Sequence, residues 1–309
     1  MDRAIKVFAP ATVANIACGF DIMGLALKGV GDTLVISTNT TGRVTMGSIT
    51  GADNLPTDPE KNVCTVAVNA LLEELKSDQG FTIDLHKNVT PGSGLGSSAS
   101  SAAGAVFAVN ELLDRPFTRK ALVKYAMAGE KIASEKAHAD NVGPSLMGGI
   151  TIIRSYTPLD IFTIPYPKDL IVSVIFPSVE IKTADAKRIL KADVPLSSAI
   201  TQWGNVAGLT AGLITSDYEL IGRSMEDVIV EPVRSILIPG YDDMKQAAMA
   251  SGALGCNISG SGPSVFAISR GWEVAEKVGQ AMGSVLAGYH IDYQKFVSEI
   301  NAEGCTILT

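Results

Sequence analysis

The expected fold is decided by one stretch of sequence, Lys87-Asn88-Val89-Thr90-Pro91-Gly92-Ser93-Gly94-Leu95-Gly96-Ser97-Ser98-Ala99. It leads into a predicted helix over Ala99–Leu113, whose first turns consist almost wholly of Ala, Ser and Gly. Glycines without a Cβ let successive backbone N–H groups face one hollow, and the positive end of the helix dipole attracts anionic oxygens. The stretch therefore predicts a polyphosphate site, with the hydroxyls of Ser97 and Ser98 at its mouth.

Two better-known glycine-rich loops do not fit this stretch. A Walker A loop ends in Gly-Lys followed by Ser or Thr, and a dinucleotide-binding loop has the spacing G-x-G-x-x-G. The glycines here stand at 92, 94 and 96, and no lysine follows the last of them. A flexible surface turn is the alternative interpretation, because Gly and Ser also gather in ordinary loops.

Strands and helices mix along the first half of the chain. Alternating apolar residues in Ile5–Phe8, Thr33–Ser37 and Phe81–Leu85 predict half-buried strands. Helical spacing predicts a helix beginning near Val63 and another over Arg119–Ala137. The second of these should bury a stripe made of Leu122, Tyr125, Ala126, Ile132 and Ala133 and carry Glu130 on its polar side.

The break between two domains is expected near residue 166. Three prolines lie between Thr157 and Pro167, and the continuous apolar run Leu170–Phe176 then predicts a new, fully buried strand. A helix near Tyr241–Ser251, a strand-turn-strand unit over Ala253–Ser269 and a final helix from Trp272 follow. We therefore expect an α+β protein with domains at 1–166 and 167–309, the second an antiparallel sheet backed by helices.

Composition limits the classes of partner. Of the 309 residues 46% are hydrophobic and only 18% are charged, with a formal net charge of −7. No excess of cations is present for nucleic acid or a membrane surface, so a small solute is the expected partner. The four cysteines lie far apart and do not have the spacing of a disulfide framework or a zinc site. No apolar run reaches the length of a membrane span, and a cytoplasmic location is expected.

The pattern P-x-x-G-L-G-S-S-A, which begins at Pro91 and ends at Ala99, resembles the phosphate loop of the GHMP kinases. Within that superfamily the chain is similar to the homoserine kinases over nearly its whole length. The further matching blocks are Pro10–Asn15, Gly19–Asp21, His138–Val142, Glu231–Arg234 and Ile258–Pro263. The resemblance implies a two-domain GHMP kinase fold, with an N-terminal domain like domain 2 of ribosomal protein S5 and a ferredoxin-like C-terminal domain.

The resemblance also implies an activity. The chain would transfer phosphate from ATP, with Mg²⁺, to the hydroxyl of L-homoserine in threonine biosynthesis, and a homodimer is a possibility. Two alternatives remain open: a GHMP kinase for a sugar, shikimate or an isoprenoid alcohol, and a non-catalytic nucleotide-binding protein of the same fold.

Family positions match residues for the phosphates and the base of ATP and for the metal. The loop residues implied to bind ATP are Pro91, Gly92, Ser93, Gly94, Leu95, Gly96, Ser97 and Ser98. Asn62 and Lys87 match positions near the nucleotide base and its surroundings, although either could instead cap a helix or lie in water. Ser98 and Glu130 match the Mg²⁺ ligands, and a solvated helix face is the alternative for Glu130.

The implied homoserine site combines a carboxylate, an amide and a guanidinium. Asn15 and Asp21 would receive the ammonium group, and Arg234 would bind the carboxylate in a bidentate manner. Asp140 would accept a hydrogen bond from the reacting hydroxyl. The residues that shape the pocket around it would be His138 and Asn141, in a strand or turn, and the glycine-rich turn at Gly260.

The residues leave two points open. Related kinases have a catalytic aspartate where this chain has Asn141, so Asp140 could remove the proton or only position the hydroxyl. We adopt catalysis by positioning and electrostatics. The family's usual carboxylate-binding arginine aligns with Lys187, and Arg188 follows it, so either residue could hold the substrate carboxylate.

Overall fold

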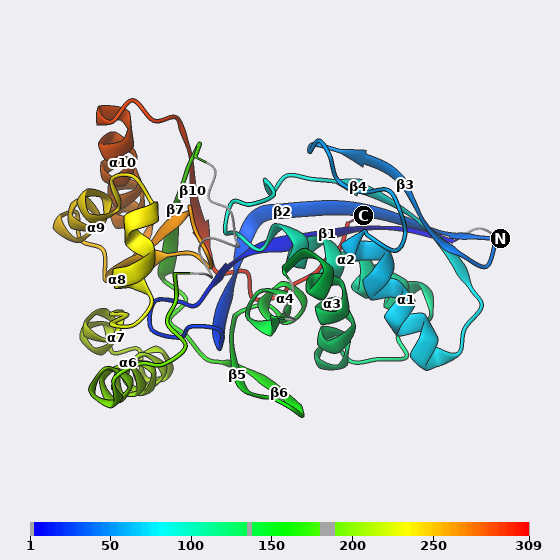
Figure 1. The fold of residues 1–309 in the computed structure, drawn as a ribbon, viewed down its shortest axis with the longest axis horizontal. Coiled ribbons are helices and arrows are strands. Elements are labelled where there is room, and N and C mark those ends of the chain that lie inside the picture. The colour runs from blue at the N-terminus through cyan, green and yellow to red at the C-terminus, as the bar shows by residue number, and fades with distance from the viewer. Residues whose placement is uncertain (1–2, 135–137, 180–188, 309) are drawn as a thin grey trace.

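The computed structural model describes residues 3–134, 138–179 and 189–308, which form two sheets placed side by side along the longest axis (Figure 1). Within these residues the first sheet has seven strands, β1 (Ala4–Ala14), β2 (Met23–Asn39), β3 (Val44–Thr50), β4 (Gly80–His86), β5 (Ile150–Tyr156), β6 (Leu159–Ile164) and β11 (Thr306–Ile307). The second sheet has four, β7 (Leu170–Pro177), β8 (Gly255–Ile258), β9 (Val265–Arg270) and β10 (Tyr293–Glu299).

The first sheet is built around the long strand β2, which pairs antiparallel with β1, β4 and β5. β3 pairs parallel with β4 at one edge, and β11 pairs antiparallel with β1 at the other. In β4 the apolar residues Phe81, Ile83 and Leu85 are buried, while the polar residues between them are half-exposed. This alternation confirms the predicted half-buried strand, with its apolar side chains in the core.

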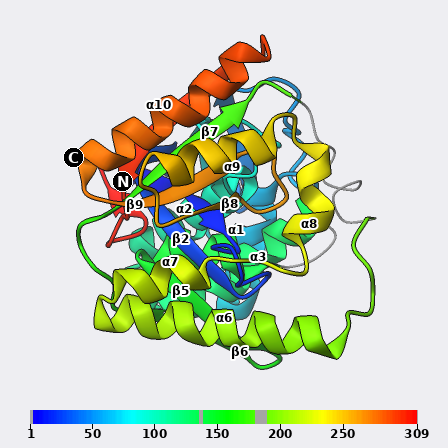
Figure 2. The same ribbon diagram turned by 90° about the vertical axis from the view of Figure 1, so that its left-hand side faces the viewer.

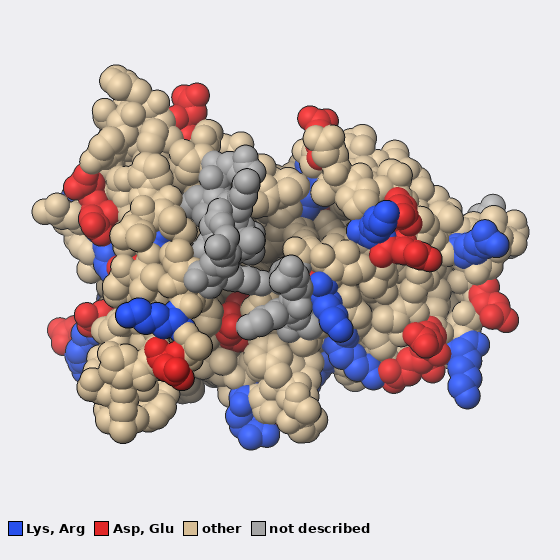
Figure 3. All heavy atoms as spheres, viewed as in Figure 1, with Lys and Arg blue, Asp and Glu red and all other residues tan. Residues whose placement is uncertain are grey.

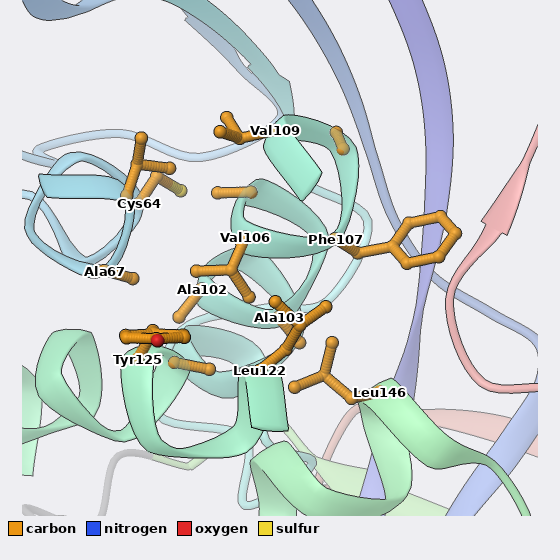
Figure 4. Packing of buried hydrophobic residues seen from close by; sticks show 14 of the residues in the cluster. Cys64, Ala67, Ala102, Ala103, Val106, Phe107, Val109, Leu122, Tyr125 and Leu146 are labelled. Carbon is orange, nitrogen blue, oxygen red and sulfur yellow. The ribbon is translucent and has the colours of Figure 1, made fainter. Parts of the chain in front are cut away.

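Four helices pack against this sheet and one another, α1 (Val63–Leu75), α2 (Ser97–Leu112), α3 (Arg119–Ser134) and α4 (Ala139–Met147). α2 lies at the centre, and fourteen of its sixteen residues are buried. Its small residues permit this position, since a Cβ on Gly104 would lie 2.5 Å from Leu34 Cδ1. Figure 4 shows Ala102, Ala103 and Val106 of α2 packed toward α1 and α3.

The helix predicted from Arg119 is confirmed as α3, but its expected stripe is only partly correct. Leu122 and Tyr125 are buried, whereas Ile132 is 43% exposed near the end of the helix. Glu130, expected on the polar side, is only 5% exposed. The solvated-face interpretation of Glu130 is therefore wrong, because α3 lies among α1, α2 and α4 and is covered there.

The second sheet is antiparallel throughout, in the order β10-β7-β9-β8. α9 (Tyr241–Ala250) and α10 (Trp272–Gly288) cover one face, and α6 (Leu196–Thr215) and α7 (Tyr218–Ser224) lie on the opposite side, as Figure 2 shows. The short helix α8 (Glu231–Arg234) and a 3₁₀ turn over Ser235–Leu237 precede α9. The predicted α+β class and the antiparallel sheet backed by helices are confirmed.

A shared apolar cluster joins the two sheets. It combines Val13 and Leu25 of the first sheet with Val172 and Phe266 of the second. Two strands, β10 and β11, follow the helix that was predicted to be the last, and β11 returns to the first sheet. The domain limits 1–166 and 167–309 stay a prediction, with the proviso that β11 extends the first sheet.

Positive and negative side chains are interspersed on the face shown in Figure 3, which carries no extended basic patch. None of the helices in the described part of the chain combines the length and apolar character that a membrane crossing requires.

Candidate active site

The glycine-rich loop connects β4 to α2 and depends on three left-handed glycines. Gly92, Gly94 and Gly96 have φ of 77°, 83° and 64°, a region that favours glycine. A Cβ on Gly96 would lie 2.1 Å from Thr12 Oγ1, so close packing also requires glycine at that position. Gly96 is the N-cap of α2 and makes no side-chain cap hydrogen bond. The first N–H groups of the helix are thus directed to this loop, as an anion site needs.

A buried ion pair between Lys87 and Asp32 fixes the glycine-rich loop to the first turns of α2. Lys87 Nζ donates to Asp32 Oδ2 at 2.5 Å, to Ser97 O at 2.7 Å and to Ser101 Oγ at 3.0 Å. An ammonium group has three protons, and these three acceptors use them all. The predicted contact between Lys87 and the nucleotide is therefore corrected: the side chain is 2% exposed and holds the first turn of α2 in place.

Asp32 was missed by the sequence analysis although it organises the whole loop base. Its Oδ1 accepts from the backbone N–H groups of Asn88 and Val89, and its Oδ2 accepts from the hydroxyls of Ser100 and Ser101. A carboxylate in the interior of a strand such as β2 is unfavourable unless it is paired. The charge of Asp32 within a strand, together with Lys87 just before the loop, was the sequence signal that could have identified this ion pair.

The loop serines have different roles. Ser97 Oγ donates to Val89 O at 2.7 Å, so the expectation that this hydroxyl lies at the mouth is wrong. Ser93 is 1% exposed, and its Oγ accepts from Leu95 N at 3.3 Å. Ser98, in the first turn of α2, is half-buried, while Pro91 and Gly92 are exposed. Of the two adjacent serines, Ser98 is the one still available for a metal or phosphate.

The loop touches the turn between β8 and β9 directly. Ser259 Oγ donates to Gly94 O at 2.7 Å, and Ser264 N donates to Ser93 O at 3.1 Å. Leu95 is 2% exposed and its carbonyl accepts from Thr12 N at 3.0 Å, which joins the loop to β1 as well. A phosphate group bound in the loop would therefore lie beside the turn between β8 and β9, which is predicted to line the substrate site.

The predicted substrate residues Asn15, Asp21, Arg234 and Gly260 come together. Asn15 Nδ2 and Arg234 Nη1 each donate to Gly260 O at 3.0 Å. Asn15 Oδ1 accepts from Asp21 N at 3.1 Å. Asn15 and Asp21 have φ of 73° and 60°, conformations that cost energy for residues other than glycine and that recur at functional sites.

Arg234 is 4% exposed and its guanidinium lies 5.2 Å from the centre of the Phe20 ring. Burial lowers the pKa of Arg234, and the charges of Asp21, Asp227 and Asp140 oppose this shift. The side chain therefore remains a cation in a low-dielectric site, where it attracts a carboxylate strongly.

Gln202 of α6 holds both substrate elements and was not predicted. Its Nε2 donates to Cys18 O in the turn after β1, and to Asp227 Oδ1. Asp227 in turn accepts from the backbone N–H of Glu231, at the start of the helix that carries Arg234. An amide on an otherwise apolar buried helix face was the only sequence signal.

His138 and Asn141 lie at the start of helix α4, so the expected strand or turn is wrong. Pro144 within the helix concealed the pattern. His138 is the N-cap, with Nδ1 3.5 Å from Asp21 Oδ1. Asn141 Oδ1 accepts from Thr12 Oγ1 at 2.7 Å. The helix start thus joins the Asp21 turn to the base of the glycine-rich loop.

Asp140, in the first turn of α4, is 3% exposed, and its Oδ1 has no hydrogen-bond partner among the described residues. Burial, with the nearby negative charges of Asp21 and Glu130, raises the pKa of Asp140 to about 8. The carboxyl group is therefore protonated at neutral pH in the free protein, unlike an exposed aspartate. A perturbed, incompletely bonded carboxyl group marks this position as a candidate reaction centre.

Three of the predicted site residues gain no support from the structure: one caps a helix, and two lie outside the described residues. Asn62 caps α1, where its side chain accepts from Cys64 N and donates to Pro56 O. The capping alternative thus holds, and its contact with the base stays a prediction. Lys187 and Arg188 lie outside the described residues.

Comparisons with known proteins agree with this geometry. The family model described as GHMP kinases N terminal domain matches residues 62–149, and the one described as GHMP kinases C terminal matches residues 209–288. The chain is 44% identical to a homoserine kinase of Chlorobium phaeovibrioides, over 99% of this chain and 100% of the relative. It is 48% identical to a homoserine kinase of Chloroherpeton thalassium, over 91% of each chain.

A solved structure covers almost the whole chain. The crystal structure of homoserine kinase from Cytophaga hutchinsonii superposes with a TM-score of 0.96 and 49% sequence identity, over 99% of this chain and 97% of the other. The fold and the matches to both halves define this protein as a GHMP kinase, an ATP-dependent phosphotransferase. Within that class, the chain belongs to the homoserine kinase family.

Proposed function

We propose that this protein transfers the γ-phosphoryl group of ATP to the side-chain hydroxyl of L-homoserine, giving O-phospho-L-homoserine and ADP for threonine biosynthesis. One observation carries the proposal: the carbonyl of Gly260, one residue after the Ser259 that bonds the Gly94 carbonyl, is bound by both Asn15 and Arg234. The turn at Gly260 therefore contacts both the phosphate loop and a set of side chains whose charges complement those of an amino acid. The relatives named as homoserine kinases supply the identity of the acceptor.

Substrate recognition follows from charge. The Arg234 guanidinium would bind the homoserine carboxylate, and the carboxylate of Asp21 with the amide of Asn15 would bind the ammonium group. Asp227 and Gln202 fix the helix and the turn that carry these groups, so little ordering is left for the moment of binding.

Asp140 would position the reacting hydroxyl. A carboxyl group protonated at neutral pH is no ready base, and its unpartnered Oδ1 can accept the hydroxyl proton in a hydrogen bond. The hydroxyl oxygen attacks the γ-phosphorus, the bond to the β-phosphate oxygen breaks, and the proton leaves to phosphate or solvent. Such catalysis depends on alignment and on stabilisation of charge by the loop N–H groups.

Mg²⁺ fits the donor set at this site. Ser98 offers a half-buried hydroxyl beside the loop, and Glu130 is a buried carboxylate close enough to Asp140 to raise its pKa. Hard cations prefer such oxygen ligands. Within the described residues no group of three or more His, Cys, Asp or Glu is arranged for a metal, which suits an ion held mainly by phosphates. When bound, Mg²⁺ would neutralise phosphate charge.

The deciding experiment is an ADP-release assay over a panel of acceptors: L-homoserine, L-serine, mevalonate, galactose and shikimate. We expect kcat/KM to be highest for L-homoserine. A preference for an acceptor without an amino group would assign the chain to another GHMP kinase activity. ATP binding without turnover on any acceptor would make it a non-catalytic nucleotide-binding protein.

We also propose a cytoplasmic location. Cys18, Cys64, Cys256 and Cys305 are all free and buried, as expected for thiols kept reduced. The homodimer that the family resemblance implies stays a prediction, which the mass of the protein in solution would test.

A further inference from the structure

The hydroxyl group of Tyr156 joins two parts of the proposed substrate site. It donates to the backbone carbonyl of Asp21 at 2.7 Å and accepts from the backbone N–H of Ala139 at 3.3 Å. A tyrosine hydroxyl has one proton to donate and a carbonyl can only accept, so the two partners assign both roles of this oxygen. Ala139 comes directly before Asp140 in the chain. A single oxygen atom therefore bridges the backbone beside the two acidic residues of the site.

The pairing of β5 with β2 brings Tyr156 to this position. Ile152 pairs antiparallel with Met23, so residues later in β5 lie beside residues earlier than Met23. Tyr156 is the last residue of β5, and Asp21 lies just before β2. α4 packs against β5 as well, and Figure 1 shows the hairpin of β5 and β6 beneath this helix. The phenol group is thus held between the turn that contains Asp21 and the start of α4.

The Tyr156 hydroxyl takes the place of a side-chain cap for α4. His138 is the N-cap of this helix and makes no side-chain cap hydrogen bond. The first N–H groups of a helix have no partner within the helix, and a polar side chain commonly accepts from one of them. Tyr156 accepts from Ala139, the first residue of α4. Loss of the hydroxyl would therefore loosen the helix start that carries Asp140.

The backbone of Asp21 is held from both sides. Asn15 Oδ1 accepts from Asp21 N at 3.1 Å, and Tyr156 donates to Asp21 O. With a φ of 60°, Asp21 has a conformation that costs energy in a residue other than glycine and needs such support. Burial, with the negative charges of Asp140 and Asp21, raises the pKa of Tyr156, so its proton stays available to the Asp21 carbonyl. The position of the Asp21 carboxylate thus depends on Tyr156 as well as on Asn15.

We propose that Tyr156 is a positioning residue that selects the length of the acceptor. Its hydroxyl fixes the separation between Asp21, which would bind the ammonium group, and Asp140, which would position the reacting hydroxyl. In L-homoserine two methylene groups separate that hydroxyl from the carbon that bears the ammonium group, whereas L-serine has one and L-2-amino-5-hydroxypentanoate has three. A fixed separation favours one length, because transfer needs the hydroxyl aligned with the phosphate. The inference rests on the proposed function and adds to it the residue that discriminates among hydroxylated amino acids.

Tyr156→Phe tests the proposal, because it keeps the ring and removes the hydroxyl. Steady-state kinetics of the full chain would give kcat and KM for ATP and for these three acceptors. We expect kcat/KM for L-homoserine to fall roughly tenfold or more, mostly through kcat, with the KM for ATP unchanged. The ratio of kcat/KM for L-homoserine to that for each other acceptor should fall by about the same factor, because an acceptor of the wrong length is already misaligned.

Tyr218→Phe is the matched control. It also removes a tyrosine hydroxyl that donates to an aspartate, in this case to the side chain of Asp169. Asp169 directly precedes Leu170, which pairs with Arg270 at the end of β9 farthest from the turn at Gly260. This variant should leave kcat/KM and the acceptor ratios at their wild-type values.

The outcomes separate this inference from the proposed function. A purely structural role for Tyr156 would lower the free energy of unfolding and reduce kcat/KM for all three acceptors by one common factor. Unchanged acceptor ratios in Tyr156→Phe would therefore overturn the inference alone, as would an unchanged kcat/KM for L-homoserine. A wild-type chain that does not prefer L-homoserine would overturn the proposed function, and this inference with it.

Discussion

The ammonium group of Lys87 lies 2.5 Å from the carboxylate of Asp32, and the two side chains are 2% and 0% exposed. Removing one partner of such a pair leaves a buried charge without compensation. We therefore expect Lys87→Met to lower the free energy of unfolding by about 3–5 kcal/mol, measured by urea denaturation.

The double variant Lys87→Met with Asp32→Asn is the control for this prediction. It removes both charges but keeps an amide oxygen that can accept from Asn88 N and Val89 N, so it should be more stable than Lys87→Met alone. If Lys87→Met kept the wild-type free energy of unfolding and changed only the KM for ATP, the lysine would have to contact the nucleotide after all.

Gly94 and Gly92 offer a matched pair of substitutions in the loop. Both have positive φ, 83° and 77°, but a Cβ on Gly94 would lie 2.6 Å from Ser259 O and 2.7 Å from Gly262 O, whereas a Cβ on Gly92 meets nothing within 4 Å. Gly92→Ala should therefore cost only the backbone strain of about 1 kcal/mol. Gly94→Ala should also displace the β8–β9 turn and raise the KM for both substrates. Equal effects of the two variants on KM would show that contact between loop and turn is unimportant.

The raised pKa of Asp140, about 8, predicts a pH dependence of stability. The unfolded chain releases this proton near pH 4, so the contribution of Asp140 to stability is complete below that pH and is lost as pH rises toward 8. Asp140→Asn removes the charged form, and its free energy of unfolding should exceed that of the wild type at pH 9 by a few kcal/mol. The two proteins should converge near pH 4. Parallel pH curves for wild type and variant would contradict the raised pKa.

Glu130 is expected to act through the metal. Glu130→Gln keeps the shape of the side chain but removes its charge, so we expect kcat to fall on the order of 10²-fold and the apparent Mg²⁺ affinity to weaken. Glu74→Gln, which breaks an exposed pair with Lys124, is the control and should change neither value. Wild-type Mg²⁺ dependence in Glu130→Gln would remove this residue from the metal site.

Substitution of Arg234 is expected to raise the KM for only one of the two substrates, homoserine. Arg234→Ala should weaken homoserine binding by about 2–5 kcal/mol in the ratio of KM values, with the KM for ATP nearly unchanged. Arg234→Lys should recover part of the loss, because it restores the charge without the guanidinium fork. The exposed Arg223 provides the control substitution, Arg223→Ala. Equal losses for ATP and homoserine in Arg234→Ala would refute the carboxylate role.

The phosphate loop and the elements beside it could be predicted because their signals are local. Glycines at 92, 94 and 96 require the backbone conformation that the structure contains, and the small residues of α2 require a buried helix. Apolar alternation likewise located β4, and the continuous apolar run located β7. These residues specify their structure by their own geometry.

The errors arose where distant parts of the chain determine the outcome. The polar face expected for Glu130 is covered by other helices. Lys87, expected near the nucleotide base, instead pairs with Asp32, 55 residues earlier. Pro144 lowers the local helix propensity of the α4 segment, but the tertiary contacts of that helix outweigh this cost. The position of Gln202 between two substrate elements needs the folded chain to be seen at all.

The pairing of β11 with β1, in which Ile307 faces Val7, has a consequence for biosynthesis. About three hundred residues separate these partners, so the outer edge of β1 stays uncovered while the ribosome makes nearly everything between them. An uncovered strand edge invites pairing with other nascent chains. Chaperones that shield this edge would matter most just before β11 emerges.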